Sequence, residues 1–501
     1  MQESLLSLGG GFQFFHATNA VLMLITINSR ADFTLDNYLR IAWLGASAAF
    51  GASALRRMAE CRTTFLHLIN SDPDLTIYGV TSGYGQHARI RLNPEERRAH
   101  ARKPPYGAAS AFGPPLPQRV TRGIVLGRLA NYVEGHAAVS PALATAVADM
   151  LDGRPLPSVS AMGQGGAGEI LGLAPLFLDL AARFDLGEKE SLALVNGSPC
   201  ATALIADAVV AWDRRLSLTE QVFALSAEAI KAPLEAYAAD LDELWNDPHE
   251  AAALRSLREH LAGGAAERRP YQAPVSYRIL PRVLGQLRRA LAQARDIAER
   301  SLKAVTDNPV YLPPDKEHPH GRVYSTGGYH NAGAYPALDA LAAAGADLCT
   351  LADKHTSKLL DGRYSLLPDQ LMTGEGYLGT LGMVQVGYAE EARRAAQGTF
   401  LPGSEGGGFG QNDVAPPTFL AWRGQEQAAF CLEASLAILA VIASQAFHAT
   451  ERPAPPALAD LLAEIRCHVP PVVEARALGP DVDQLVEAFR AKILDGVARG
   501  D

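Results

Sequence analysis

The stretch GQEQAAFCLEASLAILAVIASQAFHAT (Gly424–Thr450) decides the fold class, because its helical pattern continues for more than twenty residues. Leu284–Val305 and Ala334–Leu360 are of similar length, and alanine and leucine recur throughout them. Helices in globular proteins usually span about 8–20 residues. Three longer helices predict a bundle in which they pack side by side. We therefore expect a mainly α fold.

A smaller mixed part is expected to precede this bundle. FTLDNYLRIA (Phe33–Ala42) begins like a capped helix after a short strand, and strand patterns are otherwise rare. We place residues 1–215 in the N-terminal part and 216–501 in the long-helix part, and expect one integrated unit. Irregular Gly- and Pro-rich segments lie between the helices, at Tyr78–Gly85, Pro104–Pro117, Gly163–Gly172, Leu312–Gly328 and Leu401–Pro417. Loops on a rigid frame commonly carry the chemistry of an enzyme.

Charge and hydropathy exclude two classes of partner. The chain of 501 residues has a net charge of −9, whereas sequence-independent binding of nucleic acid needs a basic face. LEASLAILAVIASQAF (Leu432–Phe447) is apolar but contains Glu433 and Gln445. We interpret it as a buried helix, because a membrane span is longer and carries few polar groups. Neither nucleic acid nor a membrane is an expected partner.

The cysteines predict the compartment. Five cysteines lie far apart without a CxxC pair, at Cys61, Cys200, Cys349, Cys431 and Cys467. A sparse, odd set favours the reducing cytoplasm over a disulfide framework, and it indicates no zinc site. EHPH (Glu317–His320) holds two imidazoles and a carboxylate, but its Pro-rich surroundings favour a solvated loop. We expect a cytoplasmic protein without a metal site.

Six short motifs follow one another along the chain. They are IYGVTSGYG (Ile77–Gly85), LALVNGSPCATA (Leu192–Ala203), YQAPVSYRILPRVLG (Tyr271–Gly285), VTDNPVY (Val305–Tyr311), STGGYHNA (Ser325–Ala332) and GQNDVAPP (Gly410–Pro417). In this order they resemble the aromatic amino acid ammonia-lyase and aminomutase family, which includes histidine ammonia-lyase. No single motif is decisive, but the ordered set is highly specific. The resemblance implies an almost all-helical fold, shared with fumarase-type lyases. It also implies a homotetramer whose active sites combine loops of three subunits.

The resemblance further implies an electrophile, methylidene-imidazolone, which the family makes from Ala-Ser-Gly by cyclisation and loss of the serine hydroxyl. GQGGAGEI (Gly163–Ile170) stands in that place here, and Ala167 is followed directly by Gly168 and Glu169. Cyclisation of these residues could not give the methylene, because there is no β-hydroxyl to eliminate. We therefore predict a divergent member that lacks this electrophile and uses no cofactor.

Other positions also depart from the family pattern. The family's Ser-His pair falls near Tyr106-Gly107, so its histidine is absent. The Tyr of its Gln-Asp-Pro-Tyr segment becomes Val275, and the Glu of its Gln-Glu-Asp segment becomes Asn412. The matching residues that remain are Tyr78, Asn196, Gln272, Arg278, Tyr329 and Gln411.

Two of these residues carry the main functional expectations. Tyr78 matches the family's general base, and a tyrosine acts as a base near neutral pH when cations or helix N-termini lower its pKa from about 10. The alternative is a loop tyrosine that bonds to backbone. Arg278 would bind a substrate carboxylate through its planar guanidinium group. The alternative is a structural salt bridge at a helix start.

The other candidates have weaker assignments. Asn196, Gln272, Tyr329, Gln411 and Asn412 would contact the substrate, although the amides could equally bond to loop backbone. Glu169 could act as a catalytic acid or base. It could also be the counterpart of the family's structural Asp after Ala-Ser-Gly.

Three functions therefore remain open. The first is an enzyme on the ammonia-lyase fold that uses acid–base chemistry, without the electrophile, on a small carboxylate-bearing, aromatic or conjugated substrate. Elimination, addition, isomerisation and cyclisation would all fit. The second is a true histidine or aromatic amino acid ammonia-lyase or aminomutase. The third is a non-catalytic homologue that binds a small acid or a partner protein.

Overall fold

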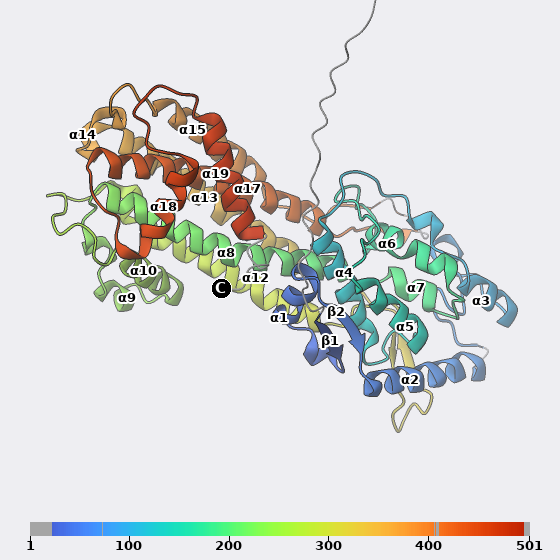
Figure 1. Ribbon diagram of the computed structural model, residues 1–501. Coiled ribbons are helices and arrows are strands. Elements are labelled where there is room, and N and C mark those ends of the chain that lie inside the picture. Colours follow the sequence, from blue (N-terminus) through green and yellow to red (C-terminus); the bar gives the residue numbers. More distant parts are fainter. Residues whose placement is uncertain (1–22, 73, 405, 407–409, 495–501) are drawn as a thin grey trace, which may run out of the picture.

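The computed structural model describes residues 23–72, 74–404, 406 and 410–494. A bundle of long helices forms one half of the molecule, and shorter helices with the strands β1 and β2 form the other (Figure 1). This arrangement confirms the predicted mainly α class, with a smaller mixed N-terminal part beside a long-helix bundle.

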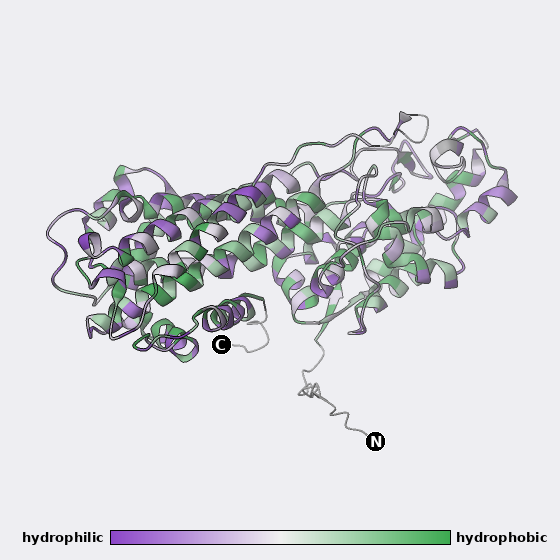
Figure 2. Cartoon of the chain, turned by 90° about the horizontal axis from the view of Figure 1, so that it is seen from above, coloured by the Kyte–Doolittle hydropathy of each residue, from purple (hydrophilic) through white to green (hydrophobic). Residues whose placement is uncertain are grey.

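The bundle is built around one apolar helix. Its long helices are α8 (Pro199–Ala229), α10 (Pro248–Leu261), α12 (Leu280–Lys303), α13 (Ala334–Leu360), α15 (Gly379–Ala395) and α17 (Thr418–Ala449). The three helices predicted from the sequence correspond to α12, α13 and α17. Of these, α17 packs against α8, α13 and α15, and every residue from Cys431 to Phe447 is buried. Hydrophobic residues accordingly concentrate along the inner part of the bundle (Figure 2).

Burial also explains the two most apolar stretches of the chain. Glu190–Ala229 and Thr418–Ala449 are long and apolar enough to cross a membrane, and 94% of the apolar window of each is buried inside the protein. Glu433 of α17 is buried there with two partners. It pairs with Arg215 of α8 at 2.7 Å and with Arg490 of α19 (Gly479–Leu494) at 3.1 Å.

The N-terminal part combines a two-stranded parallel sheet with short helices. β1 (Leu24–Ile27) pairs with β2 (Ser47–Phe50), so that Leu24 faces Ser47. The hydroxyl of Thr34 accepts a hydrogen bond from the backbone N–H of Asn37 at the start of α1 (Leu35–Tyr38), as the capped-helix pattern predicts. The remaining helices are α2 (Ala52–Ser71), α3 (Pro94–Ala101), α4 (Gln118–Tyr132), α5 (Pro141–Ala148), α6 (Ile170–Arg183) and α7 (Glu190–Val195).

One helix belongs to both parts. α8 packs against α4 of the N-terminal part and against α12, α13 and α17 of the bundle. Residue 215, the expected boundary, lies within this helix. The first turn of α8 contacts Glu169, Arg423 of α17 contacts Ala161, and Thr306 just after α12 contacts Asn131, so these helix ends lie beside segments of the N-terminal part. After α12 the chain continues into an antiparallel hairpin of β3 (Val310–Leu312) and β4 (Arg322–Tyr324).

Candidate active site

A cavity of about 160 Å³ lies where these helix ends meet the loops. Its walls are formed by Tyr78, Ala167, Gly168, Glu169, Ile170, Asn196, Gly197, Asn308, Ser325, Tyr329, Gln411 and Asn412. Residues that are far apart in the sequence therefore meet in one place. Six of the site residues expected from the sequence are among them, namely Tyr78, Glu169, Asn196, Tyr329, Gln411 and Asn412.

Arg278 and Gln272 do not reach this cavity within one chain. Both are exposed, and Arg278 ends the short helix α11 (Val275–Arg278), where its Nε donates to the carbonyl oxygen of Ala273 at 3.1 Å. Along the chain α12 separates α11 from the cavity, and its 24 residues span roughly 36 Å at the helical rise of 1.5 Å per residue. A substrate-binding role for either residue in this cavity therefore requires a second subunit.

Tyr78 lies in a loop that is anchored on both sides. Ile77 and Val80 are buried in a small apolar cluster beside α2, and the hydroxyl of Thr81 accepts a hydrogen bond from the backbone N–H of Ile77 at 2.7 Å. The half-buried Tyr78 accepts a hydrogen bond at its Oη from the N–H of Gly85 at 3.3 Å. A phenol that accepts one bond still has its own proton to donate, so this contact leaves Tyr78 able to exchange a proton with a ligand.

The carboxylate of Glu169 is directed at the N-terminus of α8. Its Oε2 accepts from the backbone N–H of Cys200 at 2.6 Å, and its Oε1 accepts from that of Ala201 at 2.8 Å. Burial raises the pKa of Glu169 to about 7, while these hydrogen bonds and the charge of Arg128 act in the opposite direction. Both oxygens therefore satisfy N–H groups at a helix start, which is a structural role. Its role as a catalytic acid or base stays a prediction.

Stability should fall as the pH rises from about 4.5 to about 7, in part through Glu169. The unfolded chain loses this proton near the ordinary pKa of 4.5, whereas the folded protein holds it until about 7. The folded state thus binds more protons in this window, and raising the pH favours unfolding. Glu169→Gln should remove about 3 kcal/mol of this pH-dependent change in the free energy of unfolding, because each pKa unit corresponds to about 1.4 kcal/mol.

Melting temperatures of both proteins between pH 4.5 and 8 measure this effect. The variant should retain a residual slope of the same sign, because burial also raises the pKa of Asp207, to about 6. If the two proteins show the same pH dependence, Glu169 does not carry the raised pKa.

The loop at residues 163–169 does not fit methylidene-imidazolone. Gly168, between Ala167 and Glu169, has no β-hydroxyl to eliminate. Its φ of +66° lies in the left-handed region, and a β-carbon added there would stand 3.3 Å from Cδ2 of Tyr329. Both the backbone conformation and the packing therefore favour glycine. Ser404 holds the same loop from outside, since its Oγ donates to the carbonyl oxygen of Gly165 at 3.2 Å.

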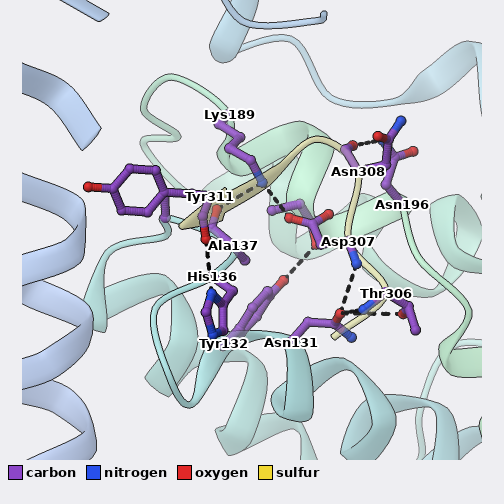
Figure 3. A network of polar contacts seen from close by, with 12 residues as sticks. Asn131, Tyr132, His136, Ala137, Lys189, Asn196, Thr306, Asp307, Asn308 and Tyr311 are labelled. Atoms are coloured by element: carbon purple, nitrogen blue, oxygen red, sulfur yellow. Dashed lines mark hydrogen bonds and ion pairs between the residues drawn. The ribbon is translucent and has the colours of Figure 1, made fainter. Parts of the chain in front are cut away.

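Two cavity residues, Asn308 and Ser325, were not selected from the sequence. The Oδ1 of Asn308 accepts from the backbone N–H of Thr326 at 2.7 Å and from the hydroxyl of Ser325 at 3.3 Å. The Nδ2 of Asn196 donates to the carbonyl oxygen of Asn308, so the two asparagines lie side by side (Figure 3). Their motifs, VTDNPVY and STGGYHNA, were the available signal, but a motif does not show which of its residues face the cavity.

Comparisons with known proteins agree with this fold. The family model described as aromatic amino acid lyase matches residues 33–185 and 179–467. The histidine ammonia-lyase of Streptomyces avermitilis is 30% identical over 66% of this chain and 69% of its own length. The histidine ammonia-lyase of Symbiobacterium thermophilum is 28% identical over 91% of this chain and 95% of its own length.

Solved structures show the same fold at lower identity. Ergothionase from Treponema denticola superposes with a TM-score of 0.84 at 18% identity, covering 94% of this chain and 99% of the ergothionase chain. Tyrosine aminomutase from Streptomyces globisporus superposes with a TM-score of 0.80 at 22% identity, covering 93% and 97%.

Proposed function

The chain belongs to the aromatic amino acid lyase family, and from this premise we propose that it is a lyase-type enzyme that works without methylidene-imidazolone. Its substrate is a small molecule with a carboxylate and an aromatic or conjugated part. The observation that carries the proposal is Gly168, which brings no β-hydroxyl to a cavity that still contains Tyr78, Asn196 and Tyr329.

The chemistry follows from what the cavity provides. General acid–base assistance supplies about 10²–10⁴-fold in rate, which is too little to remove a weakly acidic β-proton from an unactivated amino acid. The substrate must therefore be activated already, for instance by a carbonyl group next to the reacting carbon. Tyr78 moves the proton, and amide groups and helix N-termini at the cavity stabilise the negative charge that develops.

Intact mass spectrometry tests the absence of the electrophile. We expect the purified protein to have the mass of its unmodified sequence, because Ala167-Gly168-Glu169 stays an ordinary peptide. The histidine ammonia-lyase of Streptomyces avermitilis, measured in parallel, serves as the comparison protein. A mass two water molecules below that of the sequence would overturn the proposal.

A second candidate is histidine ammonia-lyase activity itself. The observation that favours it is the name shared by the curated relatives, which match up to 91% of this chain. The same mass measurement separates the two candidates when it is combined with the absorbance of urocanate. Rapid release of urocanate from histidine, together with the loss of two waters, would establish the second candidate.

We further propose that the active site is completed in a homotetramer. Arg278 lies just before the first turn of α12, and the cavity lies beyond the last turn of this helix, whose 24 residues span roughly 36 Å. Arg278 is therefore too far away to contact a ligand bound in the cavity of its own chain. The surface around it is also unusually apolar, since Tyr271, Val275 and Ile279 are 54%, 57% and 40% exposed. If a neighbouring subunit covers this surface, Arg278 would reach the cavity of that subunit.

Mixed tetramers test this arrangement. Arg278→Met should weaken binding of a carboxylate ligand by about 2–5 kcal/mol, because it removes one partner of a buried charge pair. Tyr78→Phe should remove the base instead. Co-expression of the two variants creates some sites in which both residues are intact, so part of the activity should return. If co-expression restores nothing, or if the protein sediments as a monomer at micromolar concentration, shared sites are excluded.

A further inference from the structure

We propose that Arg128 is a specificity-determining residue, whose buried positive charge makes the cavity prefer a ligand that carries a negative charge. This inference rests on the proposed function in one respect, namely that the cavity of about 160 Å³ is the substrate site. Neither lysine nor arginine is among the described residues that line this cavity. Arg128 would supply, from behind the wall, a cation that belongs to the same chain.

Arg128 is a buried arginine that lacks an acidic partner. It lies in α4 and is 0% exposed, and its Nη2 donates to the carbonyl oxygen of Asn196. Its Nε and Nη1 have no hydrogen-bond partner among the residues that the structure describes, acidic side chains included. The similarly buried Arg215, in contrast, pairs through its Nε with Glu433 at 2.7 Å. Because a buried charge without a counter-charge is costly, a negative charge brought close to Arg128 is stabilised.

Two contacts place Arg128 directly behind the cavity wall. A β-carbon on the neighbouring Gly127 would stand 3.3 Å from Cα of Pro199, so α4 packs closely against the start of α8. Arg128 itself bonds to Asn196, which lines the cavity. The carbonyl oxygen of Asn196, the negative end of its dipole, is therefore directed at the guanidinium group, and only this one residue separates Arg128 from a bound ligand.

The charge of Arg128 also reaches a second residue of the wall. Burial raises the pKa of Glu169 to about 7, and the positive charge of Arg128 counteracts this rise. The two residues do not form an ion pair, because the oxygens of Glu169 accept the backbone N–H groups of Cys200 and Ala201. A ligand carboxylate in the cavity would therefore experience a cation that no acidic side chain holds.

Calorimetric titration with trans-cinnamate and with cinnamyl alcohol, its uncharged analogue, tests this role at pH 6, where the carboxyl group of Glu169 is mostly protonated. Arg128→Gln removes the positive charge but keeps an amide N–H for the carbonyl oxygen of Asn196. We expect its affinity for trans-cinnamate to fall about tenfold or more, the effect of one unit charge at the distance of a neighbouring residue. Its affinity for cinnamyl alcohol should stay within about threefold of the wild type. Arg128→Lys keeps the charge and should retain most of the preference for the carboxylate.

Arg122→Gln is the matched control. Arg122 lies in the same helix and is also buried. Its guanidinium group donates to the carbonyl oxygens of Ile41, Ala46 and Leu151, and not to that of a residue in the cavity wall. Arg122→Gln removes a charge of the same kind and should leave the ratio of the two affinities unchanged.

Arg278→Met provides a second measurement if Arg128→Gln does not fold. Arg278 is exposed in the single chain, and its replacement leaves Arg128 in place. This variant should therefore still bind trans-cinnamate more tightly than cinnamyl alcohol. Loss of the whole preference in Arg278→Met would overturn the proposal.

Three further results would also overturn it. Arg128→Gln could keep the wild-type preference, or it could lose affinity for both probes equally, which would show that Arg128 only supports the backbone of Asn196. Wild-type protein that does not bind trans-cinnamate would overturn the proposal together with the proposed substrate class. The proposed reaction is tested separately by intact mass. A protein that has lost two waters, yet loses cinnamate affinity in Arg128→Gln, would refute the reaction and retain this role.

Discussion

Replacing Tyr78 with phenylalanine is expected to lower turnover by about 10²–10⁴-fold, the usual contribution of a general acid or base. Phenylalanine keeps the ring between the anchored residues Ile77 and Val80, so the loop should retain its position. Affinity for trans-cinnamate should change by no more than about threefold, because a neutral hydrogen bond contributes only about 0.5–1.5 kcal/mol. The measurement is the pair of turnover and calorimetric affinity, with a substrate found by screening activated carboxylates.

Tyr84 provides the matched control for this prediction. It lies in the same loop and is 43% exposed, its ring contacts that of His100 at a centroid distance of 4.7 Å, and it is not among the residues that line the cavity. Tyr84→Phe should therefore keep full turnover. If Tyr78→Phe also keeps it, Tyr78 is not the base, and a role for Glu169 or a non-catalytic function gains support.

Three of the long helices could be predicted from the sequence and one could not, because the pattern of burial differs between them. α12, α13 and α17 were recognised by their length, because alanine and leucine recur over more than twenty residues. α8 was not singled out, although it is 31 residues long. Its buried residues lie on all of its faces, since it packs against both halves of the molecule. A helix that is buried all round has no polar stripe from which its period can be recognised.

Some residues of the cavity could be predicted from the sequence, because the local backbone of their motif directs the side chain into the cavity. Tyr78 and Asn196 lie in short loops next to glycines that hold the chain at positive φ, Gly79 at +67° and Gly197 at +100°. A β-carbon on Gly197 would approach the hydroxyl of Thr306 to 2.9 Å. Glycines at such positions indicate tight turns in the sequence, because other residues rarely adopt a positive φ.

Other features depend on contacts between distant segments. The capping role of Glu169 depends on where α8 begins, thirty residues later. The position of Arg278 relative to the cavity depends on the length of α12. The orientation of the Asn308 amide depends on the backbone of Thr326, which follows the β3–β4 hairpin. No local pattern contains this information. The sequence could therefore indicate some of these residues as candidates, but it could not predict where their side chains lie.

The buried ion pair of Lys189 and Asp307 should be among the most sensitive points for stability. The two residues are 2% and 1% exposed, and the Nζ of Lys189 also donates to the carbonyl oxygen of Ala137 at 2.9 Å. Lys189→Met leaves the carboxylate of Asp307 buried without its cation, a change that typically costs about 3–5 kcal/mol. We therefore expect a clear loss of stability in urea denaturation.

An exposed pair of similar chemistry shows whether burial is the cause. Lys492 and Glu464 are 2.9 Å apart, with side chains 54% and 28% exposed, and pairs of this kind contribute about 0–1 kcal/mol. Lys492→Met should therefore shift the urea midpoint far less than Lys189→Met. Adding Asp307→Asn to Lys189→Met should recover part of the loss, because it removes the unpaired charge. Equal shifts for Lys189→Met and Lys492→Met would show that the carboxylate of Asp307 finds water or another partner, and that the segment before Asn308 does not depend on this pair.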